Sequence, residues 1–252
     1  MLPGSMNFPA SPRRPTGQFG FLPAPQPLGR TVARAFVSLA LVQRVELEAE
    51  AAAEGLQDLL DLSLEWLQQQ GFAAELEDAE RTALDTPLGE LPAATREHFG
   101  SFAETACVIG WALRRTEVPA FDVDADGSTL ADALGWLTEA GVALATGAHL
   151  RPREEVSALL DAIGAVHWRL LEHARQPSRI SMQRWAATVH DWPQGMTPLD
   201  LADGDLALDG RPLNGLDDRS LLRALRRVGE RHRAALWLLG QERAYGSVTI
   251  GG

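Results

Sequence analysis

Apolar residues recur every three or four positions through most of this chain, which is the spacing of one face of an α-helix. The clearest stretch consists of Leu56, Leu59, Leu60, Leu64 and Leu67. Gly55 precedes this stretch and Gly71 follows it, as expected for a helix with a glycine stop. Residues 199 to 213 instead alternate with a period of two, around Gly204 and Gly210. The sequence therefore predicts a mainly α fold, a single-domain helical bundle with one small β-hairpin near 199–213.

The same spacing, together with prolines, glycines and capping residues, predicts the other helices. They span residues 31–53, 77–84, 93–115, 129–140, 152–175, 181–190 and 218–239. The run at 93–115 carries apolar residues on both sides, so we expect this helix to be buried on both faces.

The first part of the chain differs from the rest in composition. Seven of the fifteen prolines lie in residues 1–27, which is typical of an extended or disordered leader. The seven tryptophans are spread along the remaining chain, and no linker-like stretch separates them. We therefore expect a leader at 1–28 and a single helical domain at 29–252.

The apolar content is compatible with an intracellular protein. No run approaches the length of a membrane-spanning helix, and the N-terminus lacks the layout of a secretion signal. The single cysteine, Cys107, lies in an apolar helical run and is expected to be a small core residue rather than a catalytic thiol. The prediction is a cytoplasmic protein that does not bind a membrane.

Charge is distributed unevenly along the chain. The net charge is −11, and residues 36–100 carry fourteen acidic residues against three arginines. A surface of this kind repels phosphate backbones, which argues against a nucleic-acid partner, and it attracts a basic protein. The alternative interpretation is a solvated helix face that only keeps the protein soluble.

Local motifs of common enzymes and cofactor sites are absent from the sequence. The segment Asp122-Val-Asp124-Ala-Asp126-Gly127 resembles a calcium loop, but its twelfth position, which needs a bidentate acid, is Ala133. We expect an ordinary acidic turn here, with no metal site, and no cofactor in the protein.

Three ionisable residues lie among apolar residues on different predicted helices, namely Glu104, His167 and His232. Arg169 and Arg231 are near enough in sequence to serve as their partners, because buried charges need them. One interpretation is a polar pocket in which a histidine acts as acid or base. The other is a satisfied buried network that fixes helix packing. The sequence identifies no catalytic residue.

Three segments carry a family resemblance. They are Ser101-Phe-Ala-Glu-Thr-Ala-Cys-Val-Ile-Gly-Trp-Ala-Leu113, Val166-His-Trp-Arg169 and Glu230-Arg-His-Arg-Ala-Ala-Leu-Trp237. In order and spacing the chain resembles bacterial proteins grouped as domain of unknown function 4272. The resemblance implies a bacterial source and draws attention to Glu104, Trp111, His167, Trp168, Arg231, His232 and Trp237. It implies no activity, and Ala235-Leu236 departs from the Leu-Asn often found in the family.

These observations lead to one candidate set and three hypotheses of function. The candidate ligand-binding residues are Glu104, Trp111, His167, Arg169, Arg231, His232 and Trp237. The first hypothesis is a non-enzymatic protein-binding module that uses its acidic surface on a basic protein, with an immunity or antitoxin role as one form. The alternative is a small-molecule enzyme or sensor with a buried Glu/His/Arg pocket. The third is a purely structural or regulatory domain. The sequence leaves the oligomeric state open.

Overall fold

The computed structural model describes residues 23–51, 54–177, 182, 193–196 and 199–250. Its helices are α1 (Leu28–Ala49), α2 (Leu56–Gln69), α3 (Asp78–Asp85), α4 (Ala93–Gly100), α5 (Phe102–Ala112), α6 (Gly127–Leu134), α7 (Glu139–Gly147), α8 (Arg153–Arg175) and α10 (Asp218–Leu238), with short 3-10 helices η1 (Phe72–Glu75) and η2 (Leu213–Gly215). The mainly α fold predicted from the sequence is therefore confirmed.

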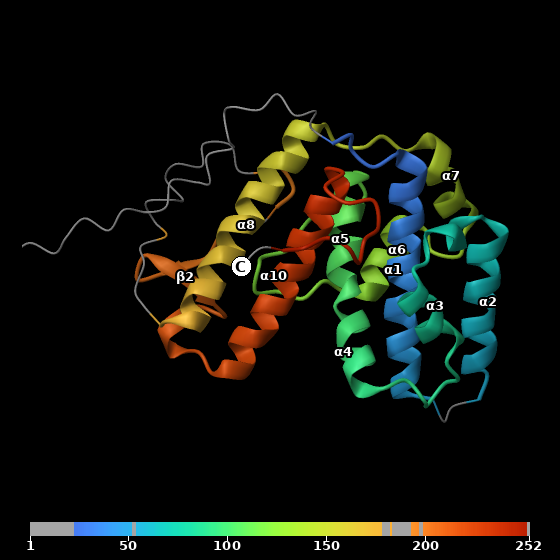
Figure 1. The fold of residues 1–252 in the computed structure, drawn as a ribbon, viewed down its shortest axis with the longest axis horizontal. Helices are drawn as coiled ribbons and strands as arrows, with labels where there is room; N and C mark the ends of the chain where they lie inside the picture. The colour runs from blue at the N-terminus through green and yellow to red at the C-terminus, as the bar shows by residue number, and fades with distance from the viewer. Residues whose placement is uncertain (1–22, 52–53, 178–181, 183–192, 197–198, 251–252) are drawn as a thin grey trace, which may run out of the picture.

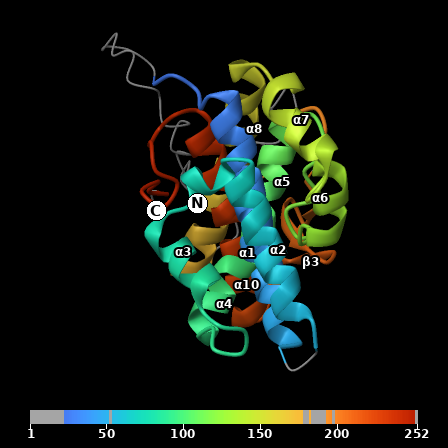
Figure 2. The ribbon, with the colours of Figure 1, turned by 90° about the vertical axis from the view of Figure 1, so that its right-hand side faces the viewer.

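Helix α1 organises one half of the molecule. Helices α2 to α7 and η1 all pack against it, and α10 lies on the far side of α5 and packs in turn on α8 (Figure 1). Residues 31–42 of α1 are buried without interruption. A helix that is buried on every side belongs in the interior of a bundle. Figure 2 shows α2 on the outside of this half, in front of α1.

An aromatic cluster holds the α1 half together. The ring of Phe36 on α1 contacts the rings of Trp66, Phe72 and Trp136, with centroid separations of 5.0, 5.1 and 5.8 Å. Such pairs contribute beyond the apolar area that they bury. Trp66 and Trp136 are partly buried and pack against the hydrophobic core. The single cysteine, by contrast, is a fully buried core residue, as the sequence predicts, and burial raises the pKa of its thiol to about 12.

The prediction of one continuous helix at 93–115 is wrong. The chain forms two helices, α4 and α5, which break at Ser101. The hydroxyl of Ser101 donates to the carbonyl of His98 at 2.6 Å, and Gly100 precedes it, so a Gly-Ser pair interrupts the helix. Burial on both faces is confirmed for α5, in which every residue from Phe102 to Ala112 is buried.

The predicted helix at 129–140 also differs from the structure. Helix α6 ends at Gly135, which adopts a left-handed conformation with φ of 72°, and α7 begins after Thr138. The hydroxyl of Thr138 caps α7 by accepting from the backbone N–H of Gly141. The sequence therefore missed α7, because a glycine C-cap and a threonine N-cap only three residues apart look like one continuous helix.

The predicted hairpin is present and has a third strand. Strands β1 (Leu201–Ala202), β2 (Asp205–Leu208) and β3 (Arg211–Pro212) form an antiparallel sheet in the order β1-β2-β3. Leu201 pairs with Leu206, and Leu208 pairs with Arg211. Both turns are Asp-Gly pairs with positive φ, the conformation that two-residue hairpin turns require.

Two predicted segments fall largely outside the described residues, namely most of the leader and most of the helix at 181–190. The described end of the leader, residues 23–27, packs on the fold: Gln26 is buried, and its backbone N–H donates to the carbonyl of Leu238 at 3.1 Å. Within the part of the chain that the structure describes, no helix combines the length and apolar character needed to cross a membrane.

The close approach of α6 and α7 gives a first testable prediction. A Cβ atom on Gly141 would lie 2.3 Å from the carbonyl oxygen of Gly135, whereas a Cβ on Gly147, at the other end of α7, would meet nothing within 4 Å. We expect Gly141→Ala to lower the free energy of unfolding by about 2 kcal/mol. Gly147→Ala should leave it unchanged or raise it by up to about 1 kcal/mol. Urea denaturation measures both; equal effects of the two variants would contradict the close contact.

Candidate functional site

The seven candidate residues do not form one site. Glu104 pairs with Arg231, His167 pairs with His232, and Arg169 pairs with Asp205. Trp111 and Trp237 are fully buried in other parts of the core. Burial is confirmed for Glu104, His167, Arg169 and Arg231, whereas His232 is only partly buried, and the structure distributes these polar residues among three separate pairs.

The Glu104–Arg231 pair joins α5 to α10. The Nε of Arg231 donates to Glu104 Oε2 at 2.6 Å, and the side chains are only 1% and 5% exposed. The remaining guanidinium donors reach the carbonyl oxygens of Pro119, Ala120 and Val123 at 2.9, 3.1 and 2.7 Å. The other carboxylate oxygen of Glu104 accepts from a backbone N–H in the same loop. A pair whose hydrogen bonds are this complete holds the loop against two helices and leaves little capacity for a ligand.

The calcium-like segment packs beside this pair. Asp122 accepts from the backbone N–H of Asp209 at 3.0 Å, Asp124 pairs with Arg227, and Asp126 caps α6 by accepting from Thr129 at 2.7 Å. The three carboxylates therefore engage different partners, as in an ordinary acidic turn. Among the described residues, no group of three or more His, Cys, Asp or Glu side chains is placed to hold a metal ion.

The two histidines meet between α8 and α10. Their Nδ1 atoms are 3.0 Å apart, and their rings are nearly perpendicular at 84°. One Nδ1 must donate and the other accept, so the neutral rings carry opposite tautomers. A Cβ on Gly164 would lie 3.7 Å from His232 Nε2, and a Cβ on Gly229 would lie 3.7 Å from His167 Nε2. Each helix therefore carries a Gly-x-x-His pattern, and the glycine of one faces the histidine of the other.

Burial governs the protonation of this pair. Desolvation lowers the pKa of His167 and, with a further contribution from the charge of His167, lowers the pKa of His232 to about 4. A base with so low a pKa is a weak proton acceptor at neutral pH. The pair is better suited to holding two helices in register than to acid-base catalysis near pH 7.

The remaining candidates have structural roles of their own. Arg169 forms two parallel hydrogen bonds with Asp205, at 2.9 and 2.6 Å, and so ties α8 to β2. The indole N–H of Trp111 donates to the carbonyl of Gln194 at 2.7 Å, and that of Trp237 donates to the carbonyl of Arg243 at 3.4 Å.

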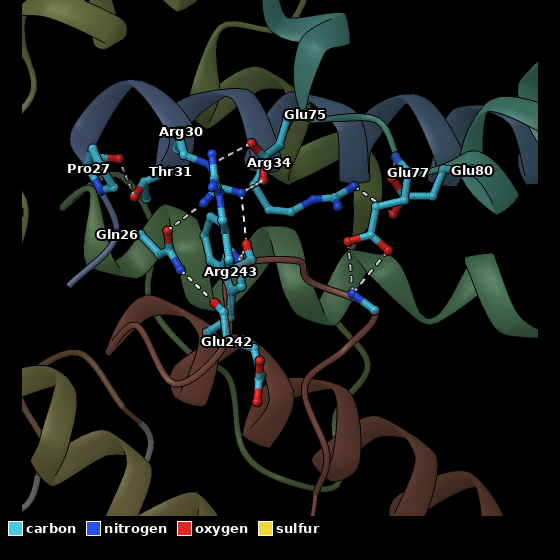
Figure 3. Close-up of polar contacts among 12 residues, drawn as sticks. Gln26, Pro27, Arg30, Thr31, Arg34, Glu75, Glu77, Glu80, Glu242 and Arg243 are labelled. Atoms are coloured by element: carbon cyan, nitrogen blue, oxygen red, sulfur yellow. Dashed lines mark hydrogen bonds and ion pairs between the residues drawn. The ribbon is translucent and has the colours of Figure 1, made fainter. Parts of the chain in front are cut away.

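Sequence reasoning missed a polar cluster where the C-terminal segment crosses α1, shown in Figure 3. Arg30 binds Glu75 at 2.8 Å and also donates to the carbonyl of Arg243 at 2.9 Å. The carboxylate of Glu77 accepts from the backbone N–H of Gly246 at 2.9 Å. These contacts fasten the C-terminal segment to the start of α1 and to Glu77, the N-cap residue of α3.

Arg34 lies one turn further along α1 in the same cluster and is completely buried. It donates to Glu80 at 2.7 Å, and its guanidinium lies 5.1 Å from the ring centroid of Tyr245. Burial raises the pKa of Glu80, although Arg34 opposes this effect. The spacing of Arg30 and Arg34, four residues apart in the mainly apolar first half of α1, was the available sequence signal. Nothing local indicated their partners.

Comparisons with models of protein families, with curated proteins and with solved structures gave no match. The resemblance to domain of unknown function 4272 therefore stays a prediction, and the function of the chain has to be argued from its own geometry.

The histidine pair predicts a specific pH dependence of stability. The unfolded chain takes up a proton near pH 6.5, whereas folded His232 does so near 4, so stability falls as the pH drops through this window. His232 alone contributes up to about 3 kcal/mol of this loss. We expect His232→Gln to flatten the curve of unfolding free energy against pH between these values. His149→Gln, at an exposed histidine, should keep the wild-type slope; identical slopes for all three proteins would contradict the argument.

Proposed function

We propose that this protein is a non-enzymatic protein-binding module that contacts a basic partner through the outer face of α2. The observation that carries the proposal is a charge pattern: residues 45–80 contain eleven acidic residues and no basic one. Helix α2 lies within this stretch, at the edge of the molecule opposite α8 (Figure 1).

The outer face of α2 combines charge with exposed apolar area. Asp58, Asp61 and Glu65 are exposed along it. Leu59 and Leu62, on adjacent turns, are 36% and 54% exposed. A single exposed leucine is common in folded proteins. Two leucines between carboxylates on one helix face resemble an interface, in which apolar contacts are surrounded by a polar rim.

Some of the acidic residues in the segment 36–100 are used inside the fold and do not contribute to its surface. Glu48, Glu75 and Glu80 are internal counter-ions of Arg44, Arg30 and Arg34. They neutralise buried or half-buried arginines and do not face a partner. On α2, by contrast, the described contacts of Asp61 and Glu65 are hydrogen bonds with glutamine side chains, which leave their negative charge uncompensated.

The alternative of a small-molecule enzyme has less support. It requires the Glu, His and Arg candidates to converge on a cavity, whereas these side chains bond to one another. An immunity or antitoxin role, in which α2 captures a basic toxin, is one concrete form of the binding proposal. Electrostatic attraction would increase the association rate of such a complex, and a higher salt concentration would decrease it.

The test uses matched variants of the full chain. Asp58→Asn/Asp61→Asn/Glu65→Gln removes the charge of the α2 face. Glu154→Gln/Asp203→Asn/Asp218→Asn removes the same charge from exposed positions on α8, the sheet and α10. Native mass spectrometry of each protein, purified at low salt from its source cells, should show a stoichiometric basic partner with wild type and with the second variant. The α2 variant should retain roughly tenfold less of it.

Once the partner is identified, measurements of association and dissociation rates separate the contribution of charge on the α2 face from that of its exposed leucines. Raising the salt concentration should slow association, and Leu62→Ser should mainly speed dissociation, because apolar contacts act after encounter. A complex that both triple variants retain equally, or one that is insensitive to salt, would contradict the proposal.

A further inference from the structure

An open cleft of about 330 Å³ lies where α5 ends and α8 begins. Its lining includes Arg114, Arg115, Thr116, Glu117, Arg151 and Gln194. Three arginines around one cleft are notable in a chain with a net charge of −11. The cleft involves none of the residues of the α2 face, so it is independent of the protein-binding proposal.

The floor of the cleft is rigid. The guanidinium of Arg151 lies 4.5 Å from the ring centroid of Trp111, and its Nε donates to the Trp111 carbonyl at 2.9 Å. Gly195, with φ of 78°, lies so close that a Cβ there would approach Trp111 Nε1 to 3.2 Å and Arg151 Nη2 to 3.5 Å. The indole and the backbone therefore hold the guanidinium in one orientation, with only 9% of its side chain exposed.

The rim of the cleft is built on a strained helix cap. The N–H of Arg115 donates to the carbonyl of Gly110, and the N–H of Arg114 donates to that of Trp111, both at 2.9 Å. This is the Schellman arrangement, in which the left-handed residue is usually glycine. Here it is Arg114, with φ of 60°. A long side chain in this conformation is costly, and such strain is typically retained where a side chain has a function.

The charges of the cleft define what it can bind. Glu155 pairs with Arg151 at 2.7 Å and with Arg114 at 3.6 Å. The side chain of Arg115 is exposed and forms no hydrogen bond or ion pair with the described residues. The three guanidinium groups thus outnumber the carboxylates of Glu117 and Glu155. A ligand has to compete with Glu155 for two of them, which favours an anion with more than one negative charge.

We propose that this cleft binds a small multivalent oxyanion of the pyrophosphate or tricarboxylate type. Arg114 and Arg115 bind it from the rim of the cleft, and Arg151 supplies a fixed hydrogen-bond donor on the floor. The planar fork of a guanidinium matches a pair of phosphate or carboxylate oxygens, and a fixed guanidinium loses little freedom on binding.

The strained cap makes a test with two opposite readouts possible. Arg114→Gly relieves the left-handed strain and removes a ligand contact. We expect this variant to melt about 2–4 °C higher than wild type. Its affinity for pyrophosphate or citrate, measured by isothermal titration calorimetry at low salt, should fall roughly tenfold or more. The gain in stability excludes misfolding as the cause of the weaker binding.

Two further variants complete the design. Glu155→Gln removes the internal competitor and should strengthen binding several-fold. Arg175→Gln removes an equivalent positive charge from an exposed position at the far end of α8 and should leave binding unchanged. Binding of one probe and not the other supports the proposal and assigns phosphate or carboxylate chemistry. No heat of binding with either probe overturns it, as does equal weakening by Arg114→Gly and Arg175→Gln, which would indicate unspecific charge attraction.

Discussion

The fold depends on arginines that are buried together with their own carboxylates. The pairs are Arg34–Glu80, Arg44–Glu48, Arg169–Asp205 and Arg231–Glu104, and each of these arginine side chains is at most 1% exposed. A buried arginine cannot lose its proton to escape the cost of desolvation, so it has to keep an anion within hydrogen-bonding distance. Three of the pairs join elements that are far apart in sequence: α1 to α3, α8 to β2, and α5 to α10. The directional guanidinium then fixes how those elements lie against one another.

This constraint also explains where the negative charge of the chain can act. Lysine is absent, so each interior cation is an arginine and takes a carboxylate with it. Acidic residues that look like a surface feature in the sequence, such as Glu48 and Glu80, are interior counter-ions in the structure. The charge left for interactions is therefore smaller than the segment 36–100 suggests. Three of the exposed carboxylates, those of Asp58, Asp61 and Glu65, lie together on α2, away from the helices that carry the histidine pair.

Hydrophobic spacing predicted most of the helices, because it reports which face of a helix turns inward. It could not report what that face meets. Arg169 and Arg231 were both expected to serve the group of Glu104, His167 and His232. Arg231 does pair with Glu104, whereas Arg169 reaches Asp205 on a strand that follows it by more than thirty residues. The break at Ser101 and the separate helix α7 were missed for a related reason: their caps depend on local backbone geometry that periodicity does not register. Helix α2, by contrast, could be predicted from the spacing of its leucines alone, without knowledge of its tertiary contacts.

The strained cap at Arg114 is tolerable because of where it lies. Every residue of α5 is buried, and the helix packs against α1 on one side and α10 on another. Its C-terminal carbonyls are further engaged, since the N–H of Arg151 donates to Ala112 and the Nε of Arg151 to Trp111. An element held by so many contacts can keep an unfavourable backbone conformation that an isolated helix end would lose to fraying. The burial of α5 is thus what allows a cation to be placed over the cleft, and the same burial keeps Trp111 fixed beneath Arg151.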